Sequence, residues 1–293
     1  MRVSSFPTIY GENIVIRILD RSNVLMNIKQ LGLSEESIKV LDEIIRSPNG
    51  VILVTGPTGS GKTTTLYAFL STINSPDKNI LTMEDPVEYR LPGVRQSQVD
   101  VKAGLTFAVG LRSIVRQDPD VILIGEIRDL ETAEISIQSA LTGHLVFSTL
   151  HTNDAPSAAT RLIDMGVEPF LISSSLKCVV AQRLVRLLCN KCKEPYKPEV
   201  SILEKLGLPS NSSYTFFREK GCEECKNTGF KGRIGIFEIM TVNDEIKEMI
   251  VRKESSNKIM KACIDNGMKT LRQDGIRKIL SGETSLSEVL RLT

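Results

Sequence analysis

The sequence predicts an α/β protein with a parallel sheet covered by helices on both faces. Strand-like apolar runs alternate with helical patterns over residues 51–188, which is the alternation that parallel sheets produce. After the first strand at 51–54, the clearest strands are 79–83, 121–124 and 145–149. A glycine-rich loop follows the first strand directly and opens a helix, which makes that step a candidate anion site.

Composition limits the class of protein. The 293 residues suggest about two domains, and 41% hydrophobic with 25% charged residues is typical of a soluble globular protein. A net charge of +2 and the absence of Trp give no sign of nucleic-acid binding. No apolar run approaches the ~18 residues of a membrane span, and Arg2, Pro7 and Glu12 interrupt any signal-peptide pattern. We therefore expect a cytoplasmic location.

The N-terminal segment predicts two strands, at about residues 2–6 and 13–19, joined by a turn-rich stretch. Two strands cannot bury a face by themselves, so they are either an edge for the next domain or the tail of a domain outside this chain. A helix is expected over 37–45, with Ser34 as its N-cap.

The C-terminal part predicts one more strand at 232–240, followed by a helical pattern with breaks near Gly267 and Gly282. The whole chain then divides into four expected parts. These are an N-terminal two-strand remnant with its linker (1–30), the α/β core (31–188), a cysteine segment (189–225), and a last core strand with a helical C-terminal extension (226–293).

The loop after the first strand matches the phosphate-binding pattern G-x-x-x-x-G-K-[ST]. Its glycines allow positive φ and close approach of the backbone to phosphate, and the helix N-terminus favours negative charge. Lys62 is expected to reach the β- and γ-phosphates, and the Thr63 hydroxyl to ligate Mg²⁺. The alternative is a chance match in an ordinary glycine turn, which the correct flanks argue against. The predicted nucleotide-binding residues are Gly56, Pro57, Thr58, Gly59, Ser60, Gly61, Lys62, Thr63 and Thr64.

Acidic and histidine residues follow three predicted strands, where ligand-contacting residues of open α/β sheets usually sit. Glu84 follows the strand at 79–83, with Asp85 and Glu88 near it, Glu126 follows the strand at 121–124, and His151 follows the strand at 145–149. A carboxylate taken alone is usually a solvated surface charge. Three sets beside a phosphate loop favour a catalytic role, with Glu84 or Glu126 activating the attacking water. The longer Glu126 side chain, where most such enzymes have Asp, favours polarising water over direct metal contact.

The chain contains two histidines, His144 and His151, and both flank the strand at 145–149. Structural histidines would be scattered along the chain. Their placement suggests that at least one of them senses the γ-phosphate, and we include both among the candidate catalytic residues.

Four of the six cysteines form two C-x-x-C pairs, Cys189 with Cys192 and Cys222 with Cys225. In a reducing compartment, two such pairs favour a tetrahedral zinc site over disulfides. A redox pair or an unmetallated remnant are the alternatives. The remaining two, Cys178 and Cys263, lie on apolar stretches that we interpret as helical, and packing is their expected role.

These motifs together resemble one family, the secretion ATPases of type II secretion and type IV pilus assembly (the GspE/PilB type). The resemblance rests on GPTGSGKTTTLYAFL at 56–70, ILTMEDPVEY at 80–89, and VILIGEIRD and STLHTNDAP within 104–156. It continues through AQRLVRLLCNKCK, GCEECKNTGFKGRIGIFEIM and SLSEVLRLT, and so covers nearly the whole chain.

The resemblance implies a RecA-like phosphate-loop ATPase core, a small tetracysteine zinc subdomain and a helical C-terminal extension. It implies a homohexamer, peripheral to the bacterial inner membrane, that acts with platform and anchor proteins and has no membrane span of its own. By position, Glu126 corresponds to the family's magnesium-site glutamate and Glu84 to the aspartate-box acid proposed as general base. His144 and His151 correspond to the histidine-box pair.

Several arginines also match the family. Arg2 and Arg17 correspond to arginines of the second N-terminal domain that close over the triphosphate, although solvated strand arginines are the plain alternative. Arg112, Arg116 and Arg128 are candidates for contacts across a subunit boundary. Members of the family generally carry further domains before this point.

The sequence thus predicts an ATP-hydrolysing motor subunit for type II protein secretion or type IV pilus assembly. The two cysteine pairs favour an assembly or secretion motor over retraction motors, which generally lack them. One alternative is a non-catalytic module that binds nucleotide without turning it over. A less favoured alternative is a nucleic-acid-translocating ATPase with a related fold.

Overall fold

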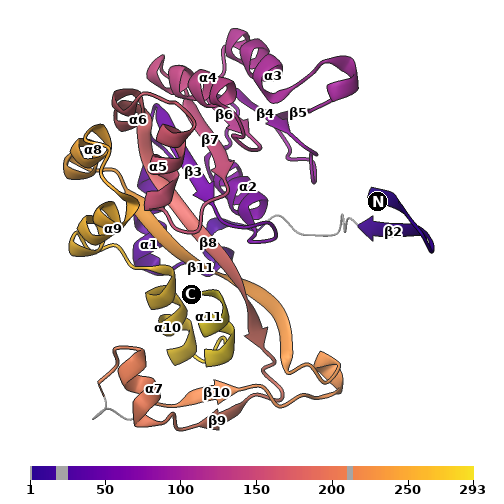
Figure 1. Cartoon of the computed structure of the whole chain (residues 1–293), viewed down its shortest axis with the longest axis vertical. Coiled ribbons are helices and arrows are strands. Elements are labelled where there is room, and N and C mark those ends of the chain that lie inside the picture. Colours follow the sequence, from indigo (N-terminus) through magenta and orange to yellow (C-terminus); the bar gives the residue numbers. More distant parts are fainter. Residues whose placement is uncertain (1, 18–25, 210–213) are drawn as a thin grey trace.

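A seven-stranded sheet forms the centre of the computed structural model, which describes residues 2–17, 26–209 and 214–293 (Figure 1). The strand order is β11-β8-β3-β7-β6-β4-β5. The bounds are β3 Gly50–Thr55, β4 Ile80–Glu84, β5 Arg95–Gln98, β6 Val121–Ile124, β7 Leu145–Leu150, β8 Leu176–Leu188 and β11 Phe230–Thr241. These bounds confirm the four strands predicted between residues 51 and 149, as well as the later one at 232–240.

The sheet is parallel, as predicted, except at one edge, where the direction of the last strand had not been predicted. Strands β3 to β8 pair in parallel, but β11 pairs antiparallel with β8 over most of its length. An antiparallel partner needs no crossover helix, so the chain leaves the sheet along β8, forms the cysteine segment and returns along β11.

Helices cover both faces of the sheet because its central strands are apolar on both sides. One core joins the sheet to α3 (Phe107–Ile114), α4 (Leu130–Leu141), α5 (Pro156–Asp164), α6 (Pro169–Ser175), α8 (Asp244–Val251) and α9 (Ser256–Asp265). The opposite core joins it to α1 (Glu35–Ile44) and α2 (Lys62–Ile73). The two-faced arrangement predicted from the sequence is therefore confirmed.

Local signals define the start of α1. The Ser34 hydroxyl accepts a hydrogen bond from the Ser37 N–H at 3.1 Å, which confirms the predicted N-cap.

Upstream, β1 (Arg2–Thr8) and β2 (Gly11–Arg17) form an antiparallel hairpin that lies apart from the sheet in Figure 1. The end of the strand predicted at 13–19 lies outside the described residues.

The outer halves of β8 and β11 extend beyond the main sheet and build a third core. Val185 and Ile236 from these strands pack there with α10 (Leu271–Leu280) and α11 (Leu286–Leu292).

Cys178 lies in β8, so its predicted helical setting is wrong. The β-branched pair that follows it suits a strand buried on both faces. Cys178 and Cys263 are both buried, and burial raises the pKa of each thiol to about 12, as expected for packing residues.

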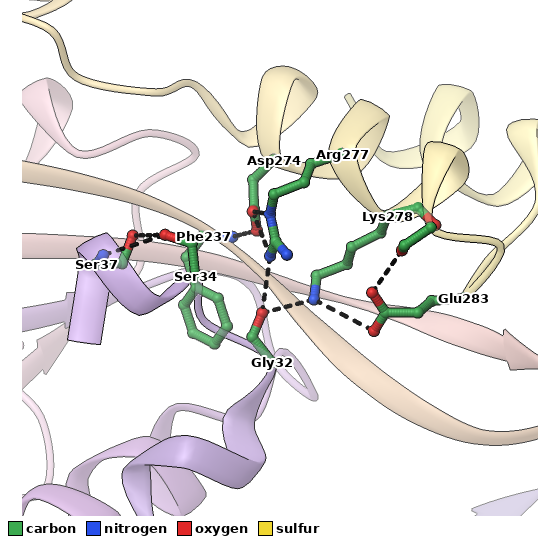
Figure 2. A network of polar contacts seen from close by, with 9 residues as sticks. Gly32, Ser34, Ser37, Phe237, Asp274, Arg277, Lys278 and Glu283 are labelled. Carbon is green, nitrogen blue, oxygen red and sulfur yellow. Dashed lines mark hydrogen bonds and ion pairs between the residues drawn. The ribbon is translucent and has the colours of Figure 1, made fainter. Parts of the chain in front are cut away.

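Helix α10 is tied to the segment before α1 and to β11, as Figure 2 shows. The buried Lys278 ammonium donates to the Gly32 carbonyl at 2.6 Å, and Arg277 donates to the same oxygen at 3.0 Å. Asp274 accepts a hydrogen bond from the Phe237 N–H at 3.0 Å. Burial lowers the pKa of Lys278. The C-terminal helices are thus joined to the core by buried polar contacts as well as by apolar packing.

Candidate functional site

The phosphate loop occupies residues 56–61, between the carboxyl end of β3 and the first turn of α2. Gly56, Gly59 and Gly61 have φ values of 147°, 80° and 89°, which L side chains rarely adopt. Gly61 is also the N-cap of α2, so the loop delivers the chain to a helix N-terminus whose N–H groups and dipole attract an anion. The sequence pattern therefore specifies a backbone shape as well as a set of side chains.

Lys62 lies over this loop. Its ammonium donates to the carbonyl oxygens of Gly56 at 2.8 Å and Pro57 at 3.1 Å. Burial lowers the pKa of Lys62, the negative charge of Glu126 raises it, and the positive charge of Arg183 lowers it further. The side chains of Glu126 and Arg183 are therefore both close enough to Lys62 to change its pKa.

A cavity of about 150 Å³ lies beside the loop, where β4, β6 and β7 end. Because parallel strands end at the same edge of a sheet, residues distant in sequence meet there. The predicted site residues that line it are Lys62, Thr63, Glu84, Asp85, Glu88, Glu126 and His151. The cavity brings phosphate-binding and acidic groups together, and Thr64, the next residue of α2, lies outside its lining.

Glu126 extends from the end of β6 and is partly open, with 16% of its side chain exposed. One carboxylate oxygen forms an ion pair with Arg128, and the other lies 3.5 Å from His151 Nε2. The hydrogen bond to Glu126 raises the pKa of Arg128. Glu126 is thus an oriented carboxylate that solvent and a ligand can still reach.

Glu84 extends from the end of β4 and is held much more tightly. It is 3% exposed; one carboxylate oxygen accepts a hydrogen bond from the Tyr67 hydroxyl. The other accepts from Thr82 Oγ1 at 2.5 Å and from Gln96 Nε2 at 3.2 Å. Burial, and then the hydrogen bond to Glu84, raise the pKa of Tyr67. A carboxylate that accepts three protein donors is rigid and well placed, but its oxygens are already engaged.

The two histidines lie at opposite ends of β7. His151 follows its carboxyl end and lines the cavity, whereas the His144 carbonyl accepts from the Gly50 N–H at the amino end of β3. Six residues of strand separate them, about 20 Å. His144 Nδ1 instead lies 2.8 Å from the Ser139 carbonyl oxygen. We predicted that at least one histidine senses the γ-phosphate: His151 lies at the cavity, whereas His144 lies away from the cavity of the same chain, and a catalytic role for either stays a prediction.

The predicted arginines have different positions. Arg2 and Arg17 are opposite each other across the β1–β2 hairpin; their side chains are outside the described structure, and their nucleotide contact stays a prediction. Arg112 forms an ion pair with Glu131 on α4.

Sequence interpretation missed two polar residues of β8 beside the loop, Gln182 and Arg183. Gln182 donates from Nε2 to the Ser60 carbonyl at 2.7 Å, and Arg183 donates to the Asn153 carbonyl at 3.0 Å. Both are buried. The sequence does show a polar pair, Gln182 and Arg183, inside the apolar run at 179–185, and this pair could have indicated a functional position. We did not recognise it because β8 was not among the clearest predicted strands.

The described residues between 189 and 229, here called the four-cysteine lobe, contain β9 (Glu194–Tyr196), α7 (Val200–Lys205) and β10 (Phe216–Arg218). The predicted cysteine set meets there, with all four sulfur atoms within 4.8 Å of one another. Its members are Cys189, Cys192, Cys222 and Cys225.

The spacing of the sulfur atoms suits zinc. Three Sγ–Sγ distances are 3.8, 3.8 and 3.7 Å. Tetrahedral ligands with Zn–S bonds of about 2.3 Å have S···S edges of about 3.8 Å. Burial opposes ionisation of Cys225, but hydrogen bonds from the N–H groups of Cys222 and Gly229, both 3.2 Å, bring its pKa down to about 6. The donor set therefore fits a structural zinc ion.

The lysines near these thiols pair mainly with carboxylates. Lys191 and Lys231 both form ion pairs with Glu224, and Lys220 pairs with Glu194. Hydrogen bonds from the two lysines lower the pKa of Glu224 to about 2. Carboxylates of the lobe thus balance the charge of these three lysines.

A phosphate loop on the first strand of a parallel sheet, facing carboxylates at neighbouring strand ends, defines a phosphate-loop nucleotide-binding protein. Within that class the chain belongs to the family described as Type II/IV secretion system protein, whose sequence model matches residues 1–291. The family expected from the motifs is confirmed.

Individual relatives give the same result. The chain is 52% identical over 293 residues to type II secretion system protein E of Pseudomonas aeruginosa, covering all of this chain and 58% of that protein. It is 50% identical over 295 residues to the type IV pilus assembly ATPase PilB of Thermus thermophilus, covering all of this chain and 33% of that protein. The chain therefore spans less than two thirds of the length of each of these relatives.

Among solved structures, the fold matches the pilus retraction motor PilT with bound ADP. The TM-score is 0.70 at 28% sequence identity, over 99% of this chain and 72% of PilT. Within the described ranges, every helix falls short of the length and apolar character that a bilayer crossing requires.

Proposed function

We propose that this chain is an ATP-hydrolysing motor subunit that powers type II protein secretion or type IV pilus assembly. The observation that carries the proposal is the cavity in which Lys62 and Thr63 face Glu84, Glu126 and His151. Family membership, and relatives named as secretion and pilus assembly ATPases, support the same function. A decayed site would not retain this complete set.

Binding begins at the phosphate loop. The N–H groups at the start of α2 and the ammonium of Lys62 would donate hydrogen bonds to oxygens of the β- and γ-phosphates. The Lys62 ammonium would then give up its hydrogen bonds to the loop carbonyls in favour of phosphate oxygens. The Thr63 hydroxyl would hold Mg²⁺, which supplies positive charge between the β- and γ-phosphates. The open face of the cavity admits the nucleotide.

Glu126 is the residue we assign to water activation. Its carboxylate is reachable, while both oxygens of Glu84 already accept protein hydrogen bonds. A carboxylate beside the γ-phosphate can orient the attacking water and take its proton. Glu84 then acts by holding Tyr67 and the end of β4 in place, and His151 fixes one oxygen of Glu126. We therefore expect substitution of Glu126 to lower ATP turnover more than substitution of Glu84.

Assembly and partners are inferred from the family. We assign the active form to a homohexamer, peripheral to the inner membrane and attached to platform and anchor proteins. Arg2 and Arg17 would close over the triphosphate, and Arg112, Arg116 and Arg128 would act across subunit boundaries. The four-cysteine lobe would hold one Zn²⁺, which supplies a covalent-like cross-link between the ends of β8 and β11.

The test compares Mg²⁺-dependent ATP turnover and ATP binding in Glu126→Gln, Glu84→Gln and Glu248→Gln. Glu248 is an exposed helix residue paired with Arg252 and serves as the matched control. We expect turnover to fall at least about 10²-fold in E126Q with binding kept, less in E84Q, and not at all in E248Q. Normal turnover by E126Q would contradict the assignment.

A further inference from the structure

A buried glutamine of β8 lies directly beneath the phosphate loop. Gln182 is 1% exposed, and it follows Ala181, which pairs with Thr55 at the end of β3. The register therefore places Gln182 level with Gly56, where the chain leaves the sheet. On its other side Gln182 pairs with Phe237 of β11, so its backbone is fixed between two neighbours.

The loop packs closely against Gln182, with one hydrogen bond and two glycines that leave no space for a side chain. The amide Nε2 donates to the Ser60 carbonyl at 2.7 Å. A Cβ atom at Gly56 would lie 2.5 Å from the Gln182 carbonyl oxygen, and one at Gly61 would lie 3.2 Å from Nε2. The loop backbone thus rests on this residue, and two of its glycines are needed for that contact as well as for their φ values.

The hydrogen bond to Ser60 has a directional consequence. In a planar trans peptide the C=O and the following N–H point in opposite directions. With the Ser60 carbonyl held towards β8, the Gly61 N–H points to the other side, where the first N–H groups of α2 gather. An anion-binding loop requires its N–H groups to converge in this way.

Buried polar atoms without a hydrogen-bond partner gather around the phosphate loop. In the described residues, four buried side-chain polar atoms have no hydrogen-bond partner, and three of them belong to Thr55, Ser60 and Gln182. Folded proteins keep few such atoms, so a concentration around one loop needs a functional reason. Arg183, the next residue, donates to both the carbonyl and the side-chain oxygen of Asn153. These two hydrogen bonds fix the position of β8 beside the loop.

We propose that Gln182 is a positioning residue for phosphate binding, because its amide holds the Ser60–Gly61 peptide in the orientation that directs an N–H at a nucleoside di- or triphosphate. The proposal rests on the nucleotide binding proposed above. Gln182 does not line the cavity, so it acts through the loop and touches no reacting atom.

The experiment measures the Kd of ADP and of ATP by calorimetry for the full chain and three variants. Gln182→Met keeps the size of the side chain but removes the donor, and we expect both Kd values to rise about tenfold, the effect of one buried hydrogen bond. Turnover at saturating ATP stays within about threefold of the unchanged chain, because the carboxylates are untouched. KM therefore changes and kcat does not.

A second variant separates positioning from simple destabilisation. Gln182→Glu presents an acceptor and a negative charge at pH 8, so we expect a loss larger than that of Q182M. As the pH falls towards 5 the carboxyl gains a proton and can donate to Ser60 as the amide does, so binding recovers relative to Q182M. The control is Thr284→Val, which removes the 2.8 Å hydrogen bond from the buried Thr284 hydroxyl to the Arg186 carbonyl, also on β8.

The outcomes are distinct. If the unchanged chain binds neither nucleotide, the proposed function fails. If it binds while folded Q182M and Q182E bind equally well, the role of Gln182 is wrong. Equal weakening by T284V and Q182M would also overturn it, because the effect would then be general destabilisation.

Discussion

The nucleotide end of the sheet and the four-cysteine lobe use polar residues in opposite ways. At the nucleotide end, Lys62, Glu126 and His151 come from three separate elements and remain partly open around a cavity. In the lobe, the four sulfur atoms face one another, and nearby charges pair locally, as Glu224 does with two lysines. The first arrangement suits binding and release of a charged ligand, and the second suits a permanent cross-link.

The two regions are joined by one strand. β8 passes beside the phosphate loop at Gln182 and ends at Leu188, directly before the first cysteine of the lobe. Near its far end, Arg186 bonds to Glu288 of α11 at 2.8 Å. If the two regions have these separate roles, a substitution in one should leave the function of the other intact. Loss of zinc should then spare nucleotide binding, and loss of ATP turnover should spare zinc binding.

The largest expected effect is loss of metal from the lobe. We predict one zinc ion per chain and none in Cys222→Ser, which leaves three thiols. Structural zinc in small domains contributes about 10 kcal/mol or more, so the lobe should lose its protection from proteolysis. Metal analysis and mass spectrometry of the fragments measure both, with Cys263→Ala as the control that keeps its zinc.

Because the nucleotide end has its own core, ATP binding by Cys222→Ser should stay within about threefold. A parallel loss of nucleotide binding would show that the two regions form one cooperative unit, contrary to the comparison.

The next largest effect comes from Lys62→Met. Removing a cation aimed at the transferring phosphoryl group should lower ATP turnover about 10²-fold or more. Zinc content and the unfolding temperature should stay unchanged, since Lys62 bonds only to loop carbonyls. Coupled ATPase assays and metal analysis on the same samples provide the measurement, and unaltered turnover would place the active site elsewhere.

The sequence predicted the phosphate loop, the strand ends around it and the cysteine set better than it predicted the setting of β8 and β11. The phosphate loop, the strands at 79–83 and 121–124, and the acids after them follow local patterns, because each motif fixes the backbone that carries it. Gln182 and the antiparallel β11 depend on which strands become neighbours, and no local pattern encodes that. The wrong setting for Cys178 has the same cause, since a short apolar run suits a buried helix or a buried strand.

A smaller effect distinguishes the two histidines. His151→Asn should reduce ATP turnover about tenfold, because its ring contacts Glu126 at the cavity. His144→Asn should leave turnover within about twofold, because its ring bonds to the end of α4 at the other edge of the sheet. Steady-state rates of ATP turnover at saturating ATP provide the measurement. Equal losses of turnover in the two variants would indicate that His144 acts in a site formed by more than one chain.

The last effect concerns the stability of the fold in acid and the carboxylate of Glu288. Burial alone would raise its pKa, but hydrogen bonds from Arg186, and then from Arg291, lower it to about 2 from the ordinary 4.5. Its ionised form therefore stabilises the fold fully above about pH 5, and this contribution is lost as the pH falls from 4.5 towards 2. Glu288→Gln should lower the free energy of unfolding by about 1–3 kcal/mol at pH 7.

Denaturant unfolding at pH 7, 4 and 3 provides the measurement for Glu288→Gln. The difference from the unchanged chain should shrink steadily as the pH falls. A difference that stays constant with pH would mean that the carboxylate charge contributes nothing to stability.

The central claim is that ATP bound at residues 56–63 is hydrolysed in the cavity formed with Glu126. Its most direct test is Mg²⁺-dependent ATP turnover per chain, measured against protein concentration with ATP binding followed on the same samples. We predict measurable turnover that rises with concentration as subunits assemble and that disappears in Glu126→Gln. Tight binding with no turnover at any concentration would contradict the account and favour a module that binds nucleotide without hydrolysing it.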